Sequence, residues 1–132
     1  RCQSPTRGFL LLPLLLAACP APQESALDNT AWRIARIDGA PAVSDEARLA
    51  FAGRKLSASA GCNHMGGAWR TDAGRLFAEE LARTEMWCEN AGLMDQEQAL
   101  ASLLSAAPEY ALEGDRLVLR SGGHVAELAR QP

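Results

Sequence analysis

Short segments of alternating apolar and polar residues fill most of the chain after residue 29, and they constrain its fold more than any other feature. Alternation with a period of two places the apolar side chains on one face of a β-strand. Turn residues such as Asp38-Gly39 and Gly53 separate neighbouring segments, which is typical of antiparallel hairpins. The predicted strands are 30–37, 47–52, 55–60, 67–71, 75–80, 109–113, 116–120 and 124–129.

One segment, residues 89–108, departs from this alternation and predicts a helix. Its apolar residues recur at helical spacing, Asn90 suits the N-cap position, and Pro108 lies just past the expected end. A lone helix of this length is marginal in water, so its apolar side must pack on the strands. The predicted fold class is α+β and β-rich: a strongly curved antiparallel sheet or a small open barrel, with the amphipathic helix packed on it.

The N-terminal segment predicts export and lipidation. Two arginines precede an apolar run, residues 9–16, that is too short for a permanent transmembrane helix. The following Leu-Ala-Ala-Cys resembles the lipobox of bacterial lipoproteins, where the signal is cleaved before the cysteine and the cysteine is acylated. We expect residues 1–18 to be a lipoprotein signal peptide and residues 19–27 to be the lipidated Cys19 with a flexible tether. An ordinary cleaved signal is the alternative.

This interpretation places the folded part, residues 28–132, in the oxidising bacterial envelope, held at the membrane by a lipid anchor. Pro20 follows the cysteine instead of the aspartate associated with inner-membrane retention, which favours the outer membrane, facing the periplasm. Because the signal carries two positive charges and no negative ones, its removal moves the formal charge from -3 to -5. The remaining basic residues are scattered, so we expect no nucleic-acid partner.

Cys62 and Cys88 are the cysteines left in the folded part, and the compartment favours a disulfide between them. It would close a loop of roughly 27 residues and stabilise the domain by on the order of 3.5 kcal/mol in the chain-entropy model. Three alternatives remain open: Cys62 as a nucleophile beside His64, a zinc site that also uses His124, or two buried free thiols. The spacing fits none of the tight zinc patterns, so we expect no metal.

Four residues are candidates for binding: Trp32, Asn63, His64 and Trp69. The tryptophans stand out in a chain poor in aromatics, and they either pack in the core or line a groove that takes an apolar ligand. Glu97 lies among core-facing positions of the predicted helix, where we expect a structural ion pair or a cap on a strand end.

The glycine-rich stretch after Cys62 predicts a turn. Gly61, Asn63, Gly66 and Gly67 are expected to shape it, and residues 64–68 are the best candidate for an exposed, rigid loop. The sequence contains no P-loop, dinucleotide fingerprint or nucleophile elbow, so we expect no enzyme, no catalytic residue and no cofactor.

Five segments, taken in order, resemble the META/HslJ family of small bacterial envelope proteins. They are LDNTAWRIARIDG (27–39), LSASAGCNHMGGAW (56–69), LARTEMWC (81–88), EQALASLL (97–104) and YALEGDRLVL (110–119). The resemblance covers residues 28–132 and implies an incomplete (cracked) β-barrel of about eight short strands with one helix. It also implies Cys62 and Cys88 as a matched pair, an envelope location and no defining enzymatic activity.

Together these features predict a non-enzymatic, lipid-anchored envelope protein, a monomer, that supports envelope integrity or tolerance of stress and antibiotics. It would do so by binding an envelope protein or an apolar ligand. The alternative is an inhibitor of a secreted hydrolase such as a lysozyme or peptidase, with residues 64–68 as its inhibitory loop, because a rigid loop loses little entropy on binding.

Overall fold

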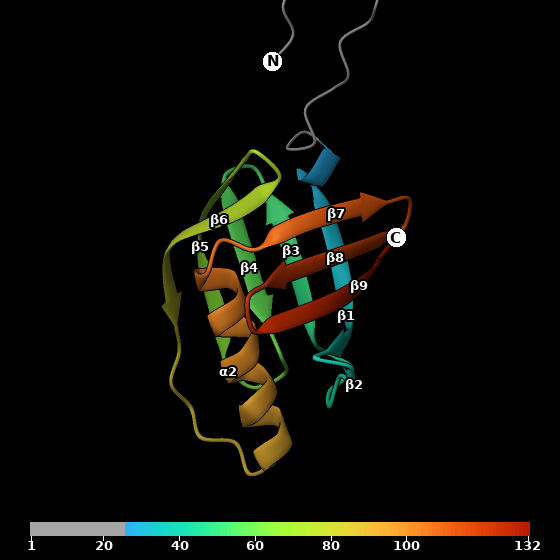
Figure 1. The fold of residues 1–132 in the computed structure, drawn as a ribbon. Helices are drawn as coiled ribbons and strands as arrows, with labels where there is room; N and C mark the ends of the chain where they lie inside the picture. Colours follow the sequence, from blue (N-terminus) through green and yellow to red (C-terminus); the bar gives the residue numbers. More distant parts are fainter. Residues whose placement is uncertain (1–25) are drawn as a thin grey trace, which may run out of the picture.

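The computed structural model describes residues 26–132, which form an antiparallel β-barrel with a helix packed against it (Figure 1). The strand order is β2-β1-β3-β4-β5-β6-β7-β8-β9, and β1 pairs with β9 as well as with β3, so eight strands close the barrel and β2 lies beside it. The predicted β-rich α+β fold is confirmed in its barrel form. The strands are β1 (Thr30–Ile37), β2 (Ala40–Pro41), β3 (Arg48–Ala52), β4 (Lys55–Ser59), β5 (His64–Asp72), β6 (Arg75–Arg83), β7 (Glu109–Glu113), β8 (Arg116–Ser121) and β9 (His124–Arg130), and the helix is α2 (Ala91–Ser105).

The barrel is weakest between β6 and β7, where Arg75 opposite Glu109 is the single registered pair of these described strands. The chain between them forms α2, which packs against β6 and β9 and covers this seam. Its three most deeply buried residues, Leu100, Leu103 and Leu104, are fully enclosed. Because β6 and β7 share so little backbone pairing, the apolar side of α2 has to supply much of what holds the two halves of the barrel together.

The prediction of a turn after Cys62 is wrong in one respect. Residues 64–68 lie in β5, so the predicted inhibitory loop does not exist there, and Gly66 and Gly67 are strand residues. The register shifts between Gly66 and Ala68: two steps along β5 face three steps along β6, from Ala82 to Glu79, so β6 carries a bulge opposite Gly67. A Cβ on Gly67 would lie 2.6 Å from the Glu79 carbonyl oxygen. Gly67 therefore allows β5 and β6 to approach closely, which is one reason that glycine occurs inside strands.

The interior is filled by large apolar side chains. Trp32 is 0% exposed and Trp69 is 6% exposed, and Phe51 meets Trp69 edge-on with ring centroids 4.8 Å apart. Both indole N–H groups donate inside the protein, Trp32 to Thr30 Oγ1 at 2.8 Å and Trp69 to the Gly53 carbonyl at 2.9 Å. Of the two roles that the sequence left open for these tryptophans, the structure supports core packing.

Strand register gives the barrel two distinct ends. At the proximal end the chain enters β1, where Thr30 pairs with Phe51 and the Gly53 amide donates to Asp28 Oδ1 at 2.9 Å. At the distal end Ser59 pairs with His64, and Thr84 follows the end of β6. The start of α2 lies at the distal end, opposite the point where the chain enters the barrel (Figure 1). The disulfide belongs to the same end, because Cys62 shortly precedes β5 and Cys88 shortly precedes α2. Within residues 26–132, no helix has the length and apolar character needed to cross a bilayer.

Candidate functional site: a pinned loop at the distal end

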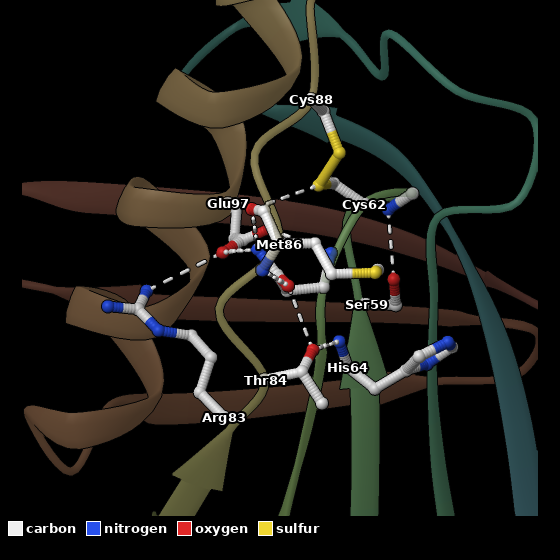
Figure 2. The surroundings of a disulfide bond; sticks show 10 residues. Ser59, Cys62, His64, Arg83, Thr84, Met86, Cys88 and Glu97 are labelled. Carbon is white, nitrogen blue, oxygen red and sulfur yellow. Dashed lines mark hydrogen bonds and ion pairs between the residues drawn. A yellow bond between two sulfur atoms is a disulfide. The ribbon is translucent and has the colours of Figure 1, made fainter.

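A disulfide joins Cys62, just after β4, to Cys88, just before α2 (Figure 2). The two Cα atoms are 6.2 Å apart and the cysteines are 26 positions apart in the sequence. The predicted pairing is confirmed. Because the bond uses both sulfur atoms, the alternatives of a thiol nucleophile, a zinc ligand and free thiols do not apply to this oxidised form. His124, the proposed fourth zinc ligand, instead binds Asp38.

Asn63 lies next to the disulfide and is only 2% exposed. Its amide nitrogen donates to the Met86 carbonyl and to Glu97 Oε2, both at 3.0 Å. Its amide oxygen accepts from Thr84 Oγ1 at 2.8 Å and from the Met86 N–H at 2.6 Å. Two donors and two acceptor positions are the full capacity of an asparagine side chain. All hydrogen-bonding groups of the Asn63 side chain are therefore used within the protein, so its role is structural.

Glu97, 3% exposed on α2, accepts from the Asn63 backbone N–H at 2.9 Å as well as from its side chain. The Arg83 guanidinium lies 3.8 Å from Glu97 Oε2, as the dashed line in Figure 2 indicates. The carboxylate thus caps the end of one strand and faces a cation from another. Both parts of the structural role expected from the sequence are confirmed, and hydrogen bonding compensates its burial.

These contacts pin the loop formed by residues 84–90, which we call the distal loop. Thr84 exchanges backbone and side-chain hydrogen bonds with His64, each at 3.0 Å. The Met86 backbone is then held by Asn63, and Cys88 is held by the disulfide. Between these fixed points the side chains of Met86 and Trp87 are 53% and 75% exposed. The loop therefore presents two large apolar side chains from a backbone with little freedom to move.

Trp87 was not among the residues that the sequence suggested for binding. Two signals distinguish it: Trp87 lies outside every alternating segment, and it directly precedes a cysteine. The selected residues have different surroundings. Trp32 and Trp69 are in the core, and the Asn63 side chain has all its hydrogen bonds made within the protein. His64 is exposed on the outer face of β5.

The rest of the distal end is also tied to the barrel. Gln96 of α2 accepts from the Val43 N–H at 2.8 Å and donates to the Pro41 carbonyl at 2.9 Å, which fixes the segment after β2. Asp38 Oδ2 lies 2.7 Å from His124 Nδ1, and Asp38 Oδ1 accepts from the Val125 N–H at 2.8 Å. Burial acts to raise the pKa of Asp38, but these hydrogen bonds and the charge of His124 outweigh it and lower the pKa below its usual value.

Fold and site together define a small, disulfide-stapled β-barrel domain with one rigid apolar loop. The chain belongs to the META domain family, whose model matches residues 25–132. It is 25% identical over 119 residues to the heat shock protein HslJ of Escherichia coli (strain K12), covering 85% of each chain.

Two solved NMR structures share the fold. One aligns with a TM-score of 0.73 and 21% identity, covering 83% of this chain and 95% of the other. The second, a protein from Burkholderia xenovorans, aligns with a TM-score of 0.68 and 20% identity, covering 93% and 99% of the two chains. At these identities the alignments establish a common architecture.

Proposed function

We propose that this META-domain protein is a non-enzymatic, lipid-anchored protein of the bacterial envelope that binds a partner protein through its distal loop and thereby supports stress tolerance. The observation that carries the proposal is the 75% exposure of Trp87 on a loop fixed by Asn63 and by the disulfide. Tryptophan is enriched among the residues that dominate binding energy at protein interfaces. A loop that is already ordered loses little conformational entropy when a partner binds.

The filled interior argues for a protein partner over an apolar ligand. A carrier needs a cavity lined by accessible apolar side chains, and the tryptophans proposed for that lining are enclosed in the core with their N–H groups satisfied. The large apolar side chains of the described residues that remain exposed are Val43, Met86 and Trp87. All three belong to the distal end, so the surface available for hydrophobic contact is concentrated there.

The same geometry suits an anchor at Cys19. The chain enters the barrel at the proximal end, so an acylated cysteine a few residues before Leu27 would hold that end near the membrane. The distal loop would then face the periplasm, with the outer membrane as the expected location. The relative from Escherichia coli is named as a heat shock protein, which supports a role under stress.

Inhibition of a secreted hydrolase remains the second candidate, because the distal loop is an exposed, fixed loop, whereas residues 64–68 form part of a β-strand. In that case the partner is an enzyme, and Trp87 enters or covers its substrate cleft. A purified lysozyme and peptidase panel separates the two candidates. If an enzyme is inhibited and Trp87→Ala abolishes the inhibition, the protein is an inhibitor. If no enzyme in the panel is inhibited, binding of a partner that is not inhibited is favoured.

The proposed function is tested by complementation. A strain lacking the gene is supplied with the wild-type chain, Cys19→Ser, Trp87→Ala or Val118→Ala, and survival is scored under heat and under envelope-acting antibiotics. Val118 is a matched control because it is a partly exposed apolar residue on β8, away from the distal loop. We expect rescue by wild type and Val118→Ala and loss of rescue by the other two at equal protein level. Rescue by Trp87→Ala at wild-type level would overturn the role of the loop.

An intact mass of the membrane-extracted chain tests the anchor. A chain that starts at Cys19 with added acyl mass is expected, with the two hydrogens of the Cys62–Cys88 pair missing. A chain without acyl mass would contradict lipid anchoring.

A further inference from the structure

A cleft of about 390 Å³ opens on the outer face of β3, β4 and β5, toward the distal end. Residues that line it include Glu46, Arg48, Ser57, Ser59, Cys62 and His64. Its volume falls in the range of about 300–1,000 Å³ that is usual for small-molecule sites. His64 was a binding candidate from the sequence, but the groups that surround it come from other strands and loops.

Strand register arranges these groups side by side. Arg48 pairs with Ser59, and Ser59 pairs with His64, so the three side chains share one face across three adjacent strands. Ser57 lies two positions before Ser59 on the same face. Ser59 is 5% exposed and forms the floor of the cleft, where its Oγ accepts from the Gly61 N–H at 2.9 Å and keeps its own hydrogen free to donate.

The two opposite charges in the cleft are unpaired. Neither Glu46 nor Arg48 forms an ion pair with any group in residues 26–132, although both line the same cleft. Elsewhere on the barrel surface Arg70 lies 2.8 Å from Glu79, and Arg116 lies 3.2 Å from Glu127. Glu46 and Arg48 therefore offer one unpaired anion and one unpaired cation in the same cleft, which suits a ligand that carries both charges.

We propose that this cleft binds a small zwitterion of dipeptide size. The ligand carboxylate meets the Arg48 guanidinium, which can hold it with two parallel hydrogen bonds, together with the Ser59 hydroxyl and the His64 ring. The ligand ammonium meets Glu46. This site does not depend on the partner proposed for the distal loop, although Cys62 connects the cleft wall to that loop through the disulfide.

A second cleft, of about 320 Å³ on β7 and β8, provides the comparison. There strand register sets Glu109 opposite Arg120 and Glu113 opposite Arg116, and Arg116 forms its ion pair with Glu127. Oppositely charged residues that face each other across neighbouring strands attract each other. Arg120→Gln is therefore a matched control for Arg48→Gln, since each removes one exposed arginine from a cleft of similar size.

The test follows backbone amide resonances of the full chain by NMR during titration with three probes: Ala-Ala, N-acetyl-Ala-Ala and Ala-Ala-amide. We expect saturable shifts at Ser57, Ser59, Gly61 and His64 with Ala-Ala. Each blocked probe loses one charged contact and should bind about tenfold more weakly or worse. The amide spectra also report whether each variant keeps the fold.

The variants show which protein charge causes the preference for Ala-Ala over each blocked probe. In Arg48→Gln, Ala-Ala and Ala-Ala-amide should bind alike, because the carboxylate has lost its cation. In Glu46→Gln, Ala-Ala and N-acetyl-Ala-Ala should bind alike, because the ammonium has lost its anion. Arg120→Gln should behave as wild type. Equal, non-saturating shifts with all three probes, or a preference that survives both variants, would overturn the proposal.

Discussion

At the scale of single residues, the distal end depends on Asn63 more than on any other polar side chain. It joins the chain after β4 to the distal loop and to α2 through four side-chain hydrogen bonds, two of which are to the Met86 backbone. A buried amide with all its hydrogen bonds made specifies one arrangement of its neighbours, because any other arrangement leaves polar groups unpaired. Asn63 thus sets the position from which Trp87 is presented.

Replacement of Asn63 by alanine should lower the free energy of unfolding by about 2–4 kcal/mol, because the buried Glu97 carboxylate and the Met86 backbone lose partners. Urea unfolding with the disulfide intact measures this. The matched control is Gln98→Ala, which truncates an exposed amide on α2 and should change stability by no more than about 0.5 kcal/mol. A loss for Asn63→Ala as small as the control would contradict the role given to this residue.

The Asp38–His124 pair gives a pH dependence whose sign is fixed. The pKa of Asp38 is lowered in the folded protein, so its contribution to stability is complete above the unfolded-state value of 3.8 and is lost as pH falls through the folded value. The difference in unfolding free energy between wild type and Asp38→Asn should therefore be larger at pH 6 than at pH 2. A difference that stays constant across this range would show that the carboxylate charge contributes nothing.

At the scale of elements, the disulfide and the β6 bulge fix how the distal end joins the barrel. The disulfide ties the connection between β4 and β5 to the connection between β6 and α2. The bulge lets β5 and β6 approach closely at Gly67. Both features act on β5 and β6, and the distal loop directly follows β6.

Removal of the disulfide by the double change Cys62→Ser and Cys88→Ser should cost about 3.5 kcal/mol of unfolding free energy, from the chain entropy of a 26-position separation. Denaturant unfolding of this variant and of the reduced wild type should give the same loss. A double variant within about 1 kcal/mol of wild type would contradict the importance of the staple.

Gly67→Ala should destabilise the protein by about 1–3 kcal/mol, because its Cβ would lie 2.6 Å from a backbone oxygen that cannot move aside cheaply. Gly66→Ala is the control on the neighbouring position of the same strand, where the nearest atom would be 3.5 Å away, an ordinary contact. Thermal unfolding of both variants measures the contrast. Equal melting temperatures would show that the bulge can relax.

Most of the elements could be predicted from the sequence because alternation, turn residues and helical spacing are local signals. Leu49 and Phe51, for example, alternate as expected and are buried. The start of β5 could not be predicted, because Gly66 and Gly67 carry the same local signal whether they form a turn or let another strand approach. That choice is made by Glu79 on β6, which the local sequence does not contain.

The candidate site was predictable only in part, for a similar reason. Cys62, Cys88 and Glu97 could be placed by compartment chemistry and helix face, and the resemblance supplied the same cysteine pair. The role of Asn63 depends on Thr84 and Met86, which are more than 20 positions away. The exposure of Trp87 depends on a loop path that no local pattern specifies.

At the scale of the whole molecule, the barrel separates two tasks along its length. Residues 26–30 enter the barrel at the proximal end, and the distal end carries the exposed apolar side chains and the proposed zwitterion cleft. The filled core between them gives the distal loop a firm base, since close-packed interiors deform little. This arrangement fits a protein that holds a binding surface away from a membrane.

The most direct test of this account places a photo-crosslinking amino acid at position 87 of the full chain in living bacteria, with position 118 on β8 as the control. The account predicts one defined adduct with another envelope protein from position 87, and loss of that adduct when Asn63→Ala displaces the loop. Position 118 should give no such adduct. The same adducts from both positions, or none from position 87 in stressed and unstressed cells, would contradict the claim that the distal loop is the binding surface.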